Sequence, residues 1–314
     1  MSEPLVSIVL LTRNGAETLP AALAAIACQR TDFAFEVIAV DSGSTDGTLA
    51  LLEPVAREVV RIVPGSFNHG LTRNLAIQHA RGELVVLLVQ DALPSSDDWL
   101  TRLTAPLRTN PQVAGAFCRQ RPRDDATAIT RHYLEAWVAA STGARSVALK
   151  DVRELDMLDS LARLRLCAFD NVCSCIRRAV WARIPFVDTP IGEDLEWAKA
   201  VLLAGFRLDY VPDAVVLHSH DRSARYELAR TYVLHRRLFS LFGLRTIPTV
   251  PALARAIAGS IRLHLACERK AGQSGGVKAG LGRALALAIA WPLGQYLGGL
   301  SAARGWKPIR INSV

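Results

Sequence analysis

The sequence lacks the short motifs by which several classes of protein hold metals or nucleotides. Its six cysteines form no C-x-x-C pair and stand at no ligand spacing from a histidine, so neither a zinc site nor a disulfide framework is predicted. GxGxxG is missing, as is GxxxxGK followed by serine or threonine. The dinucleotide fingerprint and the P-loop are therefore both excluded.

Targeting and membrane-spanning sequences are missing as well. Residues 6–11 are apolar but too few for a signal peptide, and no basic segment precedes them, so a cytoplasmic protein is expected. Residues 284–300 form an apolar run of 17 residues, broken by Pro292 and Gln295. A transmembrane helix needs roughly 20 such residues. In-plane attachment to a membrane or an oligomer interface is predicted instead.

Charge divides the chain into two parts. Residues 222–314 have 15 lysines and arginines against 2 acidic residues, a balance of +13, whereas residues 1–221 have 22 against 27, a balance of −5. The acidic first part argues against nucleic-acid binding. Arg255, Arg262 and Arg269 recur every seven residues on one face of an amphipathic helical pattern. This suits a peripheral position on the cytoplasmic face of an anionic inner membrane, with a homo-oligomer as the open alternative.

Strand-like apolar runs alternate with helical stretches in the first hundred residues. Runs at residues 5–11, 35–40, 59–64 and 83–89 are each followed by a polar tip and a helical pattern. This repetition predicts a doubly wound, Rossmann-like α/β sheet whose tips share one edge. The almost entirely apolar residues 83–89 are expected in the middle of a parallel sheet, and Pro94 is expected to end the ladder.

Polar residues at the shared edge are candidates for a binding site. Asp41 and Asp91 directly follow two of the strands, and open α/β sheets bind ligands beyond the carboxyl ends of their strands. Arg73 lies near the start of a predicted helix and suits the diphosphate of a nucleotide. Two alternatives stay open: Asp91 only caps the helix that begins near Ser95, or the tip after Asp41 is only a turn.

Four segments, in this order, resemble the family-2 glycosyltransferases, which are inverting enzymes of the GT-A fold. They are VSIVLLTRNGAETL, FEVIAVDSGSTDGT, HGLTRNLAIQHARGELVVLLVQDALP and IGEDLEWAKAVLLAGFRLDYVPDAVVLHSH, between Val6 and His220. HGLTRN, VQDALP and FCRQRPRDDA resemble bacterial rhamnosyltransferases that use dTDP-rhamnose. The resemblance implies a GT-A domain at residues 1–221, with a donor half at residues 1–120 and an acceptor half at residues 121–221. Residues 222–314 then form a basic helical extension.

The resemblance also implies which residues bind the substrates. In the family, the tips of the first two strands bind the nucleotide, and an arginine lies near the phosphates. The matching residues here are Thr12, Asn14, Asp41, Ser42 and Arg73, and the further substrate-binding candidates are Gln90, Trp197 and His220. His220 is expected to approach the leaving phosphate.

The metal motif of the family, D-x-D, is incomplete in this chain. Asp91 stands at its last position, and Val89 replaces its first aspartate. Asp91 is expected to bind Mg²⁺ or Mn²⁺, with His218 as a second ligand at the family's metal-binding histidine. The missing carboxylate favours a dTDP donor. A UDP-sugar donor and a non-catalytic nucleotide-sugar-binding subunit stay open as alternatives.

Glu193 and Asp194 match the family's E-D motif, which supplies the general base for the acceptor hydroxyl. In a helix that begins here, Asp194 shares a face with Ala198, whereas Glu193 lies with Glu196. We therefore expect Asp194 to point toward the protein and to act as the base. Glu193 is expected to point more toward solvent. The alternative is that both acids only stabilise the helix N-terminus.

The acceptor half is less defined by its sequence. Residues 113–118 predict a strand, and the arginines at 119, 121 and 123 are either solvated loop charges or contacts to an anionic substrate. Residues 126–140 predict a helix and residues 141–150 a loop. Asp170 and Asn171 are expected within a strand at residues 164–176, with their role open.

The expected function is inverting transfer of a sugar to a hydroxyl group. The resemblance favours rhamnose from dTDP-rhamnose as the donor and a glycan or a lipid-linked molecule as the acceptor. Metal dependence and a carboxylate base follow from the same resemblance.

Overall fold

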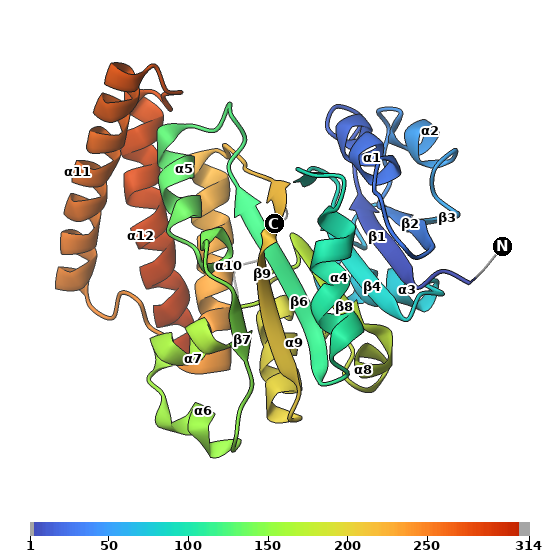
Figure 1. Cartoon of the computed structure of the whole chain (residues 1–314). Coiled ribbons are helices and arrows are strands. Elements are labelled where there is room, and N and C mark those ends of the chain that lie inside the picture. Colours follow the sequence, from blue (N-terminus) through green and yellow to red (C-terminus); the bar gives the residue numbers. More distant parts are fainter. Residues whose placement is uncertain (1–2, 308–314) are drawn as a thin grey trace.

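A mixed sheet runs through the molecule, and helices cover both of its faces (Figure 1). The computed structural model describes residues 3–307. The strands are β1 (Val6–Thr12), β2 (Phe35–Asp41), β3 (Glu58–Arg61), β4 (Leu84–Val89), β5 (Leu93–Pro94), β6 (Val113–Arg121), β7 (Arg145–Val147), β8 (Cys173–Arg177) and β9 (Arg207–Leu217). Within the described part of the chain they form one nine-stranded sheet in the order β3-β2-β1-β4-β8-β6-β9-β5, with β7 paired to β9. The predicted α/β class is confirmed.

The helices connect these strands and then form a C-terminal group. Several begin at a polar residue whose side chain accepts a hydrogen bond from the first turn, as Asn68 does from the Leu71 amide. The helices are α1 (Leu19–Ala27), α2 (Thr48–Leu52), α3 (His69–Gln78), α4 (Trp99–Thr109), α5 (Ala128–Glu135), the 3₁₀ helix η1 (Val138–Ala140), α6 (Arg153–Met157), α7 (Ser160–Leu166), α8 (Arg178–Arg183), α9 (Glu193–Leu203), α10 (Ala224–Phe242), α11 (Val250–Ser274) and α12 (Leu281–Ala303).

Two hydrophobic clusters fill the two sides of the sheet. Ile8 of β1 belongs to the cluster that contains Trp99 of α4. Its neighbour Val9 belongs to the cluster that contains Ile77 of α3 and Leu238 of α10. Because successive side chains of a strand point to opposite faces, α4 covers one face of the sheet, and α3 and α10 cover the other.

The sheet around β4 differs from the sequence prediction. β4 is parallel to β1, but its other neighbour is the antiparallel strand β8, so β4 does not lie within a purely parallel sheet. The ladder of β4 ends at Val89, before Pro94, but Leu93 and Pro94 then form an unexpected separate pairing with β9 as β5. β5 lies at the end of the strand order, and an edge strand tolerates the missing N–H of proline.

The acceptor half departs further from the expected elements. β6 continues to Arg121, so Arg119 and Arg121 belong to a strand instead of a loop. β7 occupies part of the predicted loop, and α5 and η1 divide the predicted helix. Asp170 and Asn171 precede β8 and do not lie within a strand. Pairing with β9 extends β6, and such a partner distant in the sequence is invisible to a local pattern.

The C-terminal helices pack together, and α12 lies between α10 and α11 (Figure 1). Its apolar residues Ala284, Leu287 and Ala288 are buried. No helix within residues 3–307 has the length and the apolar character needed to cross a membrane. Most of the apolar run at residues 284–300 is therefore covered by the protein itself, and the prediction that it inserts into a membrane surface loses its basis.

The first C-terminal helix also belongs to the main core. Leu238 and Phe242 of α10 lie in the same hydrophobic cluster as the helix α9 and the sheet. Asp221 joins the two parts, because its carboxylate accepts hydrogen bonds from Thr127 and forms an ion pair with Arg283 of α12. The boundary at residue 221 between a catalytic domain and a basic extension therefore stays a prediction, which rests on the difference in charge between the two parts.

We predict that Gly298 is required for the contact between α12 and α10. A Cβ atom at this position would overlap the Tyr232 carbonyl oxygen of α10. Gly298→Ala should therefore lower the free energy of unfolding by about 1–3 kcal/mol, the usual effect of overpacking, in urea titrations. Gly259→Ala is the matched control, because a Cβ atom at Gly259 in α11 meets no atom within 4 Å. The free energy of unfolding of the control should rise by up to about 1 kcal/mol, because alanine has a higher helix propensity than glycine. Equal effects of the two changes would contradict the close contact between α12 and α10.

Candidate active site

The carboxyl ends of β1, β2 and β4 meet at one edge of the sheet. Thr12 is in register with Asp41, and Leu11 with Val89. The segments that follow these strands therefore lie side by side. Thr12, Asn14, Asp41, Ser42 and Asp91 are all brought to this edge, as the alternation of strands and tips predicts.

Asp41 organises the tip of β2. Its carboxylate accepts hydrogen bonds from the Gly43 and Ser44 amides at 3.0 and 2.9 Å, and from the Thr12 and Ser44 hydroxyls. Asp41 is only 2% exposed. Ser42 donates its hydroxyl hydrogen to the Thr12 carbonyl oxygen at 3.0 Å. These residues thus fix the shape of the tip, and their side chains are already engaged within it.

Asn14 and Gln90 fix the loop that follows β1. Asn14 has a left-handed backbone, with φ at 46°, and its side-chain oxygen accepts a hydrogen bond from the Thr45 amide at 2.9 Å. The Gln90 side chain accepts from the Arg13 amide at 2.9 Å and donates to the Arg13 carbonyl oxygen at 3.1 Å. A side chain at Gly15 would lie 2.6 Å from the Gln90 oxygen. A larger residue at this position would therefore displace the Gln90 side chain from its contacts with the loop.

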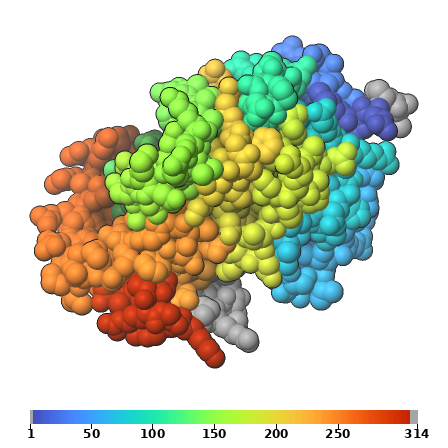
Figure 2. All heavy atoms as spheres, turned by 90° about the horizontal axis from the view of Figure 1, so that it is seen from below, coloured from blue at the N-terminus to red at the C-terminus, as the bar shows by residue number. Residues whose placement is uncertain are grey.

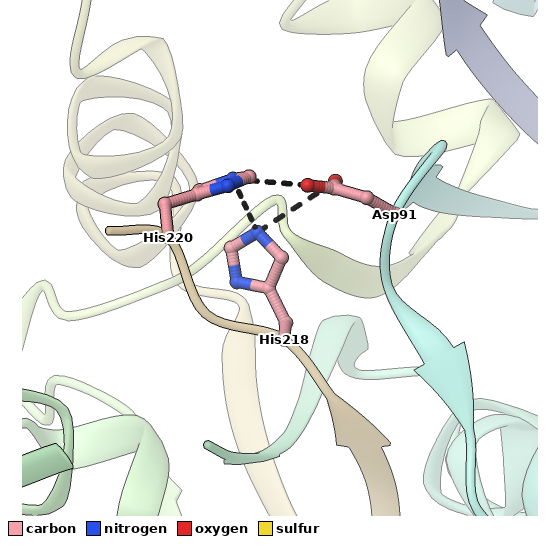
Figure 3. A group of neighbouring side chains, drawn as sticks. All are labelled: Asp91, His218 and His220. Carbon is pink, nitrogen blue, oxygen red and sulfur yellow. Dashed lines mark hydrogen bonds and ion pairs between the residues drawn. The ribbon is translucent and has the colours of Figure 1, made fainter. Parts of the chain in front are cut away.

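Asp91, His218 and His220 form one group of side chains, which we call the Asp/His group (Figure 3). The His220 Nε2 atom lies 3.0 Å from one Asp91 oxygen, and the His218 Nε2 atom lies 3.7 Å from the other. The two Nε2 atoms are 3.1 Å apart. All three ligand atoms lie within 4.8 Å of one another. His220 therefore lies beside His218 and Asp91, and its expected contact with the leaving phosphate stays a prediction.

The pairing of β5 with β9 assembles the Asp/His group. Leu93 is in register with Leu217. Continuing the antiparallel register places Asp91 opposite Ser219, between the two histidines. This short pairing at Leu93 and Pro94, which the sequence did not predict, is therefore the feature that brings Asp91 to His218.

The donor atoms of this group fit a divalent cation. Burial lowers the pKa of His218 to about 4, although the Asp91 charge opposes this shift. Burial likewise lowers the pKa of His220. Neutral imidazoles keep a lone pair for a metal. Imidazole nitrogens and a carboxylate oxygen are both common ligands of divalent metal ions in proteins.

Arg73 and Glu193 form a buried ion pair across α3 and α9. Their closest nitrogen and oxygen atoms are 2.7 Å apart, and the two side chains are 6% and 5% exposed. The Asn171 side chain also faces the same Glu193 oxygen, at 3.3 Å. The guanidinium of Arg73 is therefore engaged by Glu193, and its expected contact with the nucleotide phosphates stays a prediction.

The expected solvent-facing direction of Glu193 is wrong. Glu193 is 4% exposed, whereas Asp194 is partly exposed. A helical wheel describes only the faces of α9 itself. It does not include the Arg73 guanidinium of α3, whose attraction directs Glu193 inward.

Asp194 is a carboxylate with no cationic partner among the described residues. It accepts hydrogen bonds from the Leu195 amide at 2.8 Å and the Asn171 amide at 3.4 Å. Burial raises its pKa well above the usual value, and the negative charges of Glu193 and Asp170 raise it further. A partly exposed carboxyl with a raised pKa has the properties of a proton acceptor.

Trp197 does not lie at a binding surface. It is 2% exposed and packs against Phe169 and Phe186. Its indole N–H donates to the Ile184 carbonyl oxygen at 2.9 Å. Trp197 is therefore a core residue, which corrects its assignment as a substrate-binding candidate.

The sequence assigned no definite role to three residues near the site, which are Arg123, Asp170 and Gln120. Arg123 donates to the Asp91 carbonyl oxygen at 2.6 Å. Asp170 accepts hydrogen bonds from Gln120 at 2.7 Å and from Trp137 at 3.2 Å. The alternation of side chains along β6 could have indicated Gln120. This residue lies between two arginines in the sequence and so points to the opposite face of the strand.

Comparison with known proteins now identifies the class of this chain. The family described as Glycosyl transferase family 2 matches residues 7–160. The O-antigen chain rhamnosyltransferase RfbN of Salmonella typhimurium is 28% identical over 231 residues, which are 72% of this chain and 70% of that protein. The protein is a glycosyltransferase. The two matches together support a family-2 glycosyltransferase.

Solved structures share its fold. The mannosyltransferase PcManGT from Pyrobaculum calidifontis, solved with GDP-Man and Mn²⁺, has a TM-score of 0.58 at 21% identity, over 98% of this chain and 89% of that chain. Glucosyl-3-phosphoglycerate synthase from Mycobacterium tuberculosis, solved with Mn²⁺, UDP and glucosyl-3-phosphoglycerate, has a TM-score of 0.53 at 19% identity, over 77% and 81% of the two chains. The GT-A fold predicted from the sequence is confirmed.

We predict opposite effects on stability for the two neighbouring acids. Burial raises the pKa of Glu193, but the charges of Arg73 and His69 lower it below its usual value. Glu193→Gln leaves Arg73 buried without a counter-charge and should cost about 3–5 kcal/mol at neutral pH. This difference should shrink as the pH falls below the usual glutamate pKa, because protonation removes the same ion pair.

Asp194→Asn is the matched control for this prediction. Because the folded state raises the pKa of Asp194, ionisation of this carboxyl destabilises the protein as the pH rises. The asparagine variant should therefore be as stable as the parent or more stable at neutral pH. Urea unfolding of both variants across pH measures their free energies of unfolding. A Glu193→Gln protein as stable as the parent at neutral pH would contradict the stabilising role of the ion pair.

Proposed function

We propose that the protein transfers rhamnose from dTDP-rhamnose to a hydroxyl of a glycan or a lipid-linked acceptor, with inversion at the sugar carbon. The similarity to an O-antigen chain rhamnosyltransferase over most of the chain supports this substrate class. Val89 in place of a carboxylate at the first D-x-D position supports a deoxyribose donor. Inversion of the β-linked sugar of the donor gives an α-rhamnoside.

Asp194 is the proposed general base. The acceptor oxygen attacks the sugar carbon, its proton passes to the Asp194 carboxylate, and the bond from that carbon to the diphosphate oxygen breaks. The raised pKa of Asp194 brings its proton affinity closer to that of the reacting hydroxyl. Glu193 has a different role, because its pairing with Arg73 holds the first turn of α9 in place.

Asp91, His218 and His220 are proposed to hold a divalent cation, Mn²⁺ or Mg²⁺. The donor atoms of the Asp/His group support this, since two neutral imidazoles and a carboxylate already converge. A bound cation would neutralise the charge that develops on the leaving diphosphate. Thr12, Asn14, Asp41 and Ser42 shape the adjoining tips, which are proposed to receive the nucleoside.

We predict that Asp194→Asn lowers the transfer rate by a factor of about 10² to 10⁴, the usual contribution of a general base. The affinity for dTDP should stay near that of the parent, because Asp194 comes from α9 and not from the tips of β1 and β2. Steady-state kinetics and calorimetry measure the two quantities. A variant that transfers sugar at the parent rate would contradict the role of Asp194.

The donor prediction is tested by calorimetry in the presence of Mn²⁺. We expect dTDP to bind more tightly than UDP, and dTDP-rhamnose to be consumed in preference to UDP-sugars. Val89→Asp is the informative variant, because it restores the first carboxylate of the motif at the end of β4. This variant should gain affinity for UDP relative to dTDP. Tighter binding of UDP than dTDP by the parent protein would contradict the proposed donor.

The C-terminal helices are proposed to attach the enzyme to an anionic membrane surface, where lipid-linked acceptors are found. Figure 2 shows these helices, orange to red, gathered at one end of the molecule. Arg255, Arg262 and Arg269 are exposed on the outer face of α11. Each arginine that reaches an anionic surface contributes about 1 kcal/mol. Because α12 is largely covered, we propose that attachment is chiefly electrostatic.

We predict that the protein floats with anionic liposomes at low salt and is released at high salt, because screening removes an electrostatic attachment. Replacing Arg255, Arg262 and Arg269 together by glutamine should abolish flotation. The matched control replaces Arg61, Arg81 and Arg153, which are also exposed but lie outside the C-terminal helices. Equal loss in both triple variants, or flotation that survives high salt, would contradict this mode of attachment.

A further inference from the structure

Gln120 of β6 connects the Asp/His group to Asp170. It is 5% exposed, and its two amide atoms face different partners. The Gln120 oxygen lies 3.3 Å from the His218 Nδ1 atom. The Gln120 nitrogen donates to an Asp170 oxygen at 2.7 Å. One buried side chain therefore spans the space between a proposed metal ligand and a carboxylate near Asp194.

The hydrogen-bond partners of Asp170 fix the orientation of the Gln120 amide. The Trp137 indole N–H, which can only donate, bonds to the same Asp170 oxygen at 3.2 Å. The Val172 amide donates to the other oxygen at 3.0 Å. Both oxygens of Asp170 thus act as acceptors. While Asp170 is ionised, it can only accept, so the NH₂ group of Gln120 faces Asp170 and the Gln120 oxygen faces His218.

This orientation decides the tautomer of His218. An amide oxygen only accepts hydrogen bonds, so the proton of the neutral imidazole is on Nδ1. The lone pair is then on Nε2, which lies 3.7 Å from Asp91 and 3.1 Å from the Nε2 atom of His220. The opposite tautomer would direct an N–H into the Asp/His group.

We propose that Gln120 is the positioning residue that holds His218 with the Nε2 lone pair directed at the Asp/His group, and that Mn²⁺ binding depends on it. This inference rests on the metal site of the proposed function. Partners that orient a metal-binding histidine through its other ring nitrogen typically account for 10- to 100-fold in metal affinity. Gln120 also makes the orientation of His218 depend on Asp170. While Asp170 accepts a hydrogen bond from the Gln120 nitrogen, the Gln120 amide cannot flip, and its oxygen stays directed at His218.

The Mn²⁺ affinity is measured by titrating the full-length protein with Mn²⁺ and recording the electron paramagnetic resonance signal of the free ion. Gln120→Leu should bind Mn²⁺ about 10- to 100-fold more weakly than the parent. Gln29→Leu is the matched control. Gln29 also bridges two segments through both ends of its amide, to the Ser96 carbonyl oxygen and the Leu100 amide, and it lies outside the Asp/His group. The control should lose stability while its Mn²⁺ affinity stays unchanged.

Gln120→Glu separates positioning from general damage. A glutamate keeps an oxygen that accepts from His218 Nδ1, but it loses the donor to Asp170. This variant should therefore keep most of the Mn²⁺ affinity that Gln120→Leu loses. The tautomer is read directly from ¹⁵N spectra of the metal-free protein labelled at histidine, with the His218 signals assigned by their loss in His218→Asn. We expect the proton on Nδ1 in the parent and in Gln120→Glu.

The outcomes distinguish this inference from the metal site on which it rests. A parent protein that binds no Mn²⁺ would contradict the metal site itself. A parent protein that binds Mn²⁺ but has the His218 proton on Nε2 in its metal-free form would contradict the role of Gln120 alone. Parent-like Mn²⁺ affinity in Gln120→Leu would contradict it as well.

Discussion

The buried ion pair between Arg73 and Glu193 gives two adjacent carboxylates different chemistry. It joins α3 to the first turn of α9, with its nitrogen and oxygen 2.7 Å apart. One acid, Glu193, is thereby paired and its pKa lies below the usual value. Asp194, the next residue, forms no ion pair within residues 3–307, and its pKa is raised. Because a buried charge without its partner is strongly destabilising, the position of Asp194 depends on this pair remaining intact.

The Asp/His group depends on a second constraint, the short antiparallel pairing of β5 with β9. Asp91 follows β4, whereas β8 and β6 separate β4 from β9 in the sheet. The chain therefore crosses the sheet edge after Asp91 and pairs Leu93 with Leu217. This crossing brings Asp91 to His218 and His220 at the carboxyl edge, where parallel α/β sheets bind their ligands.

The sequence predicted the features that local pattern controls. The strand ends at Thr12, Asp41 and Val89 follow from apolar runs that stop at polar residues, and the register of β1 with β2 and β4 then aligns them. What it missed depends on partners distant in the chain. The inward direction of Glu193 requires Arg73, and the β5 pairing requires β9. The burial of residues 284–300 requires α10 and α11, because composition alone cannot distinguish helix packing from membrane insertion.

The central claim is that one site combines a cation held by the Asp/His group with Asp194 as the base. Its most direct test is a crystal structure with Mn²⁺ and dTDP, using anomalous scattering to locate manganese. We predict a single strong peak bound by Asp91, His218 and His220 and in contact with the diphosphate, with Asp194 left free on the acceptor side. Manganese bound elsewhere, or coordinated by Asp194, would contradict the account.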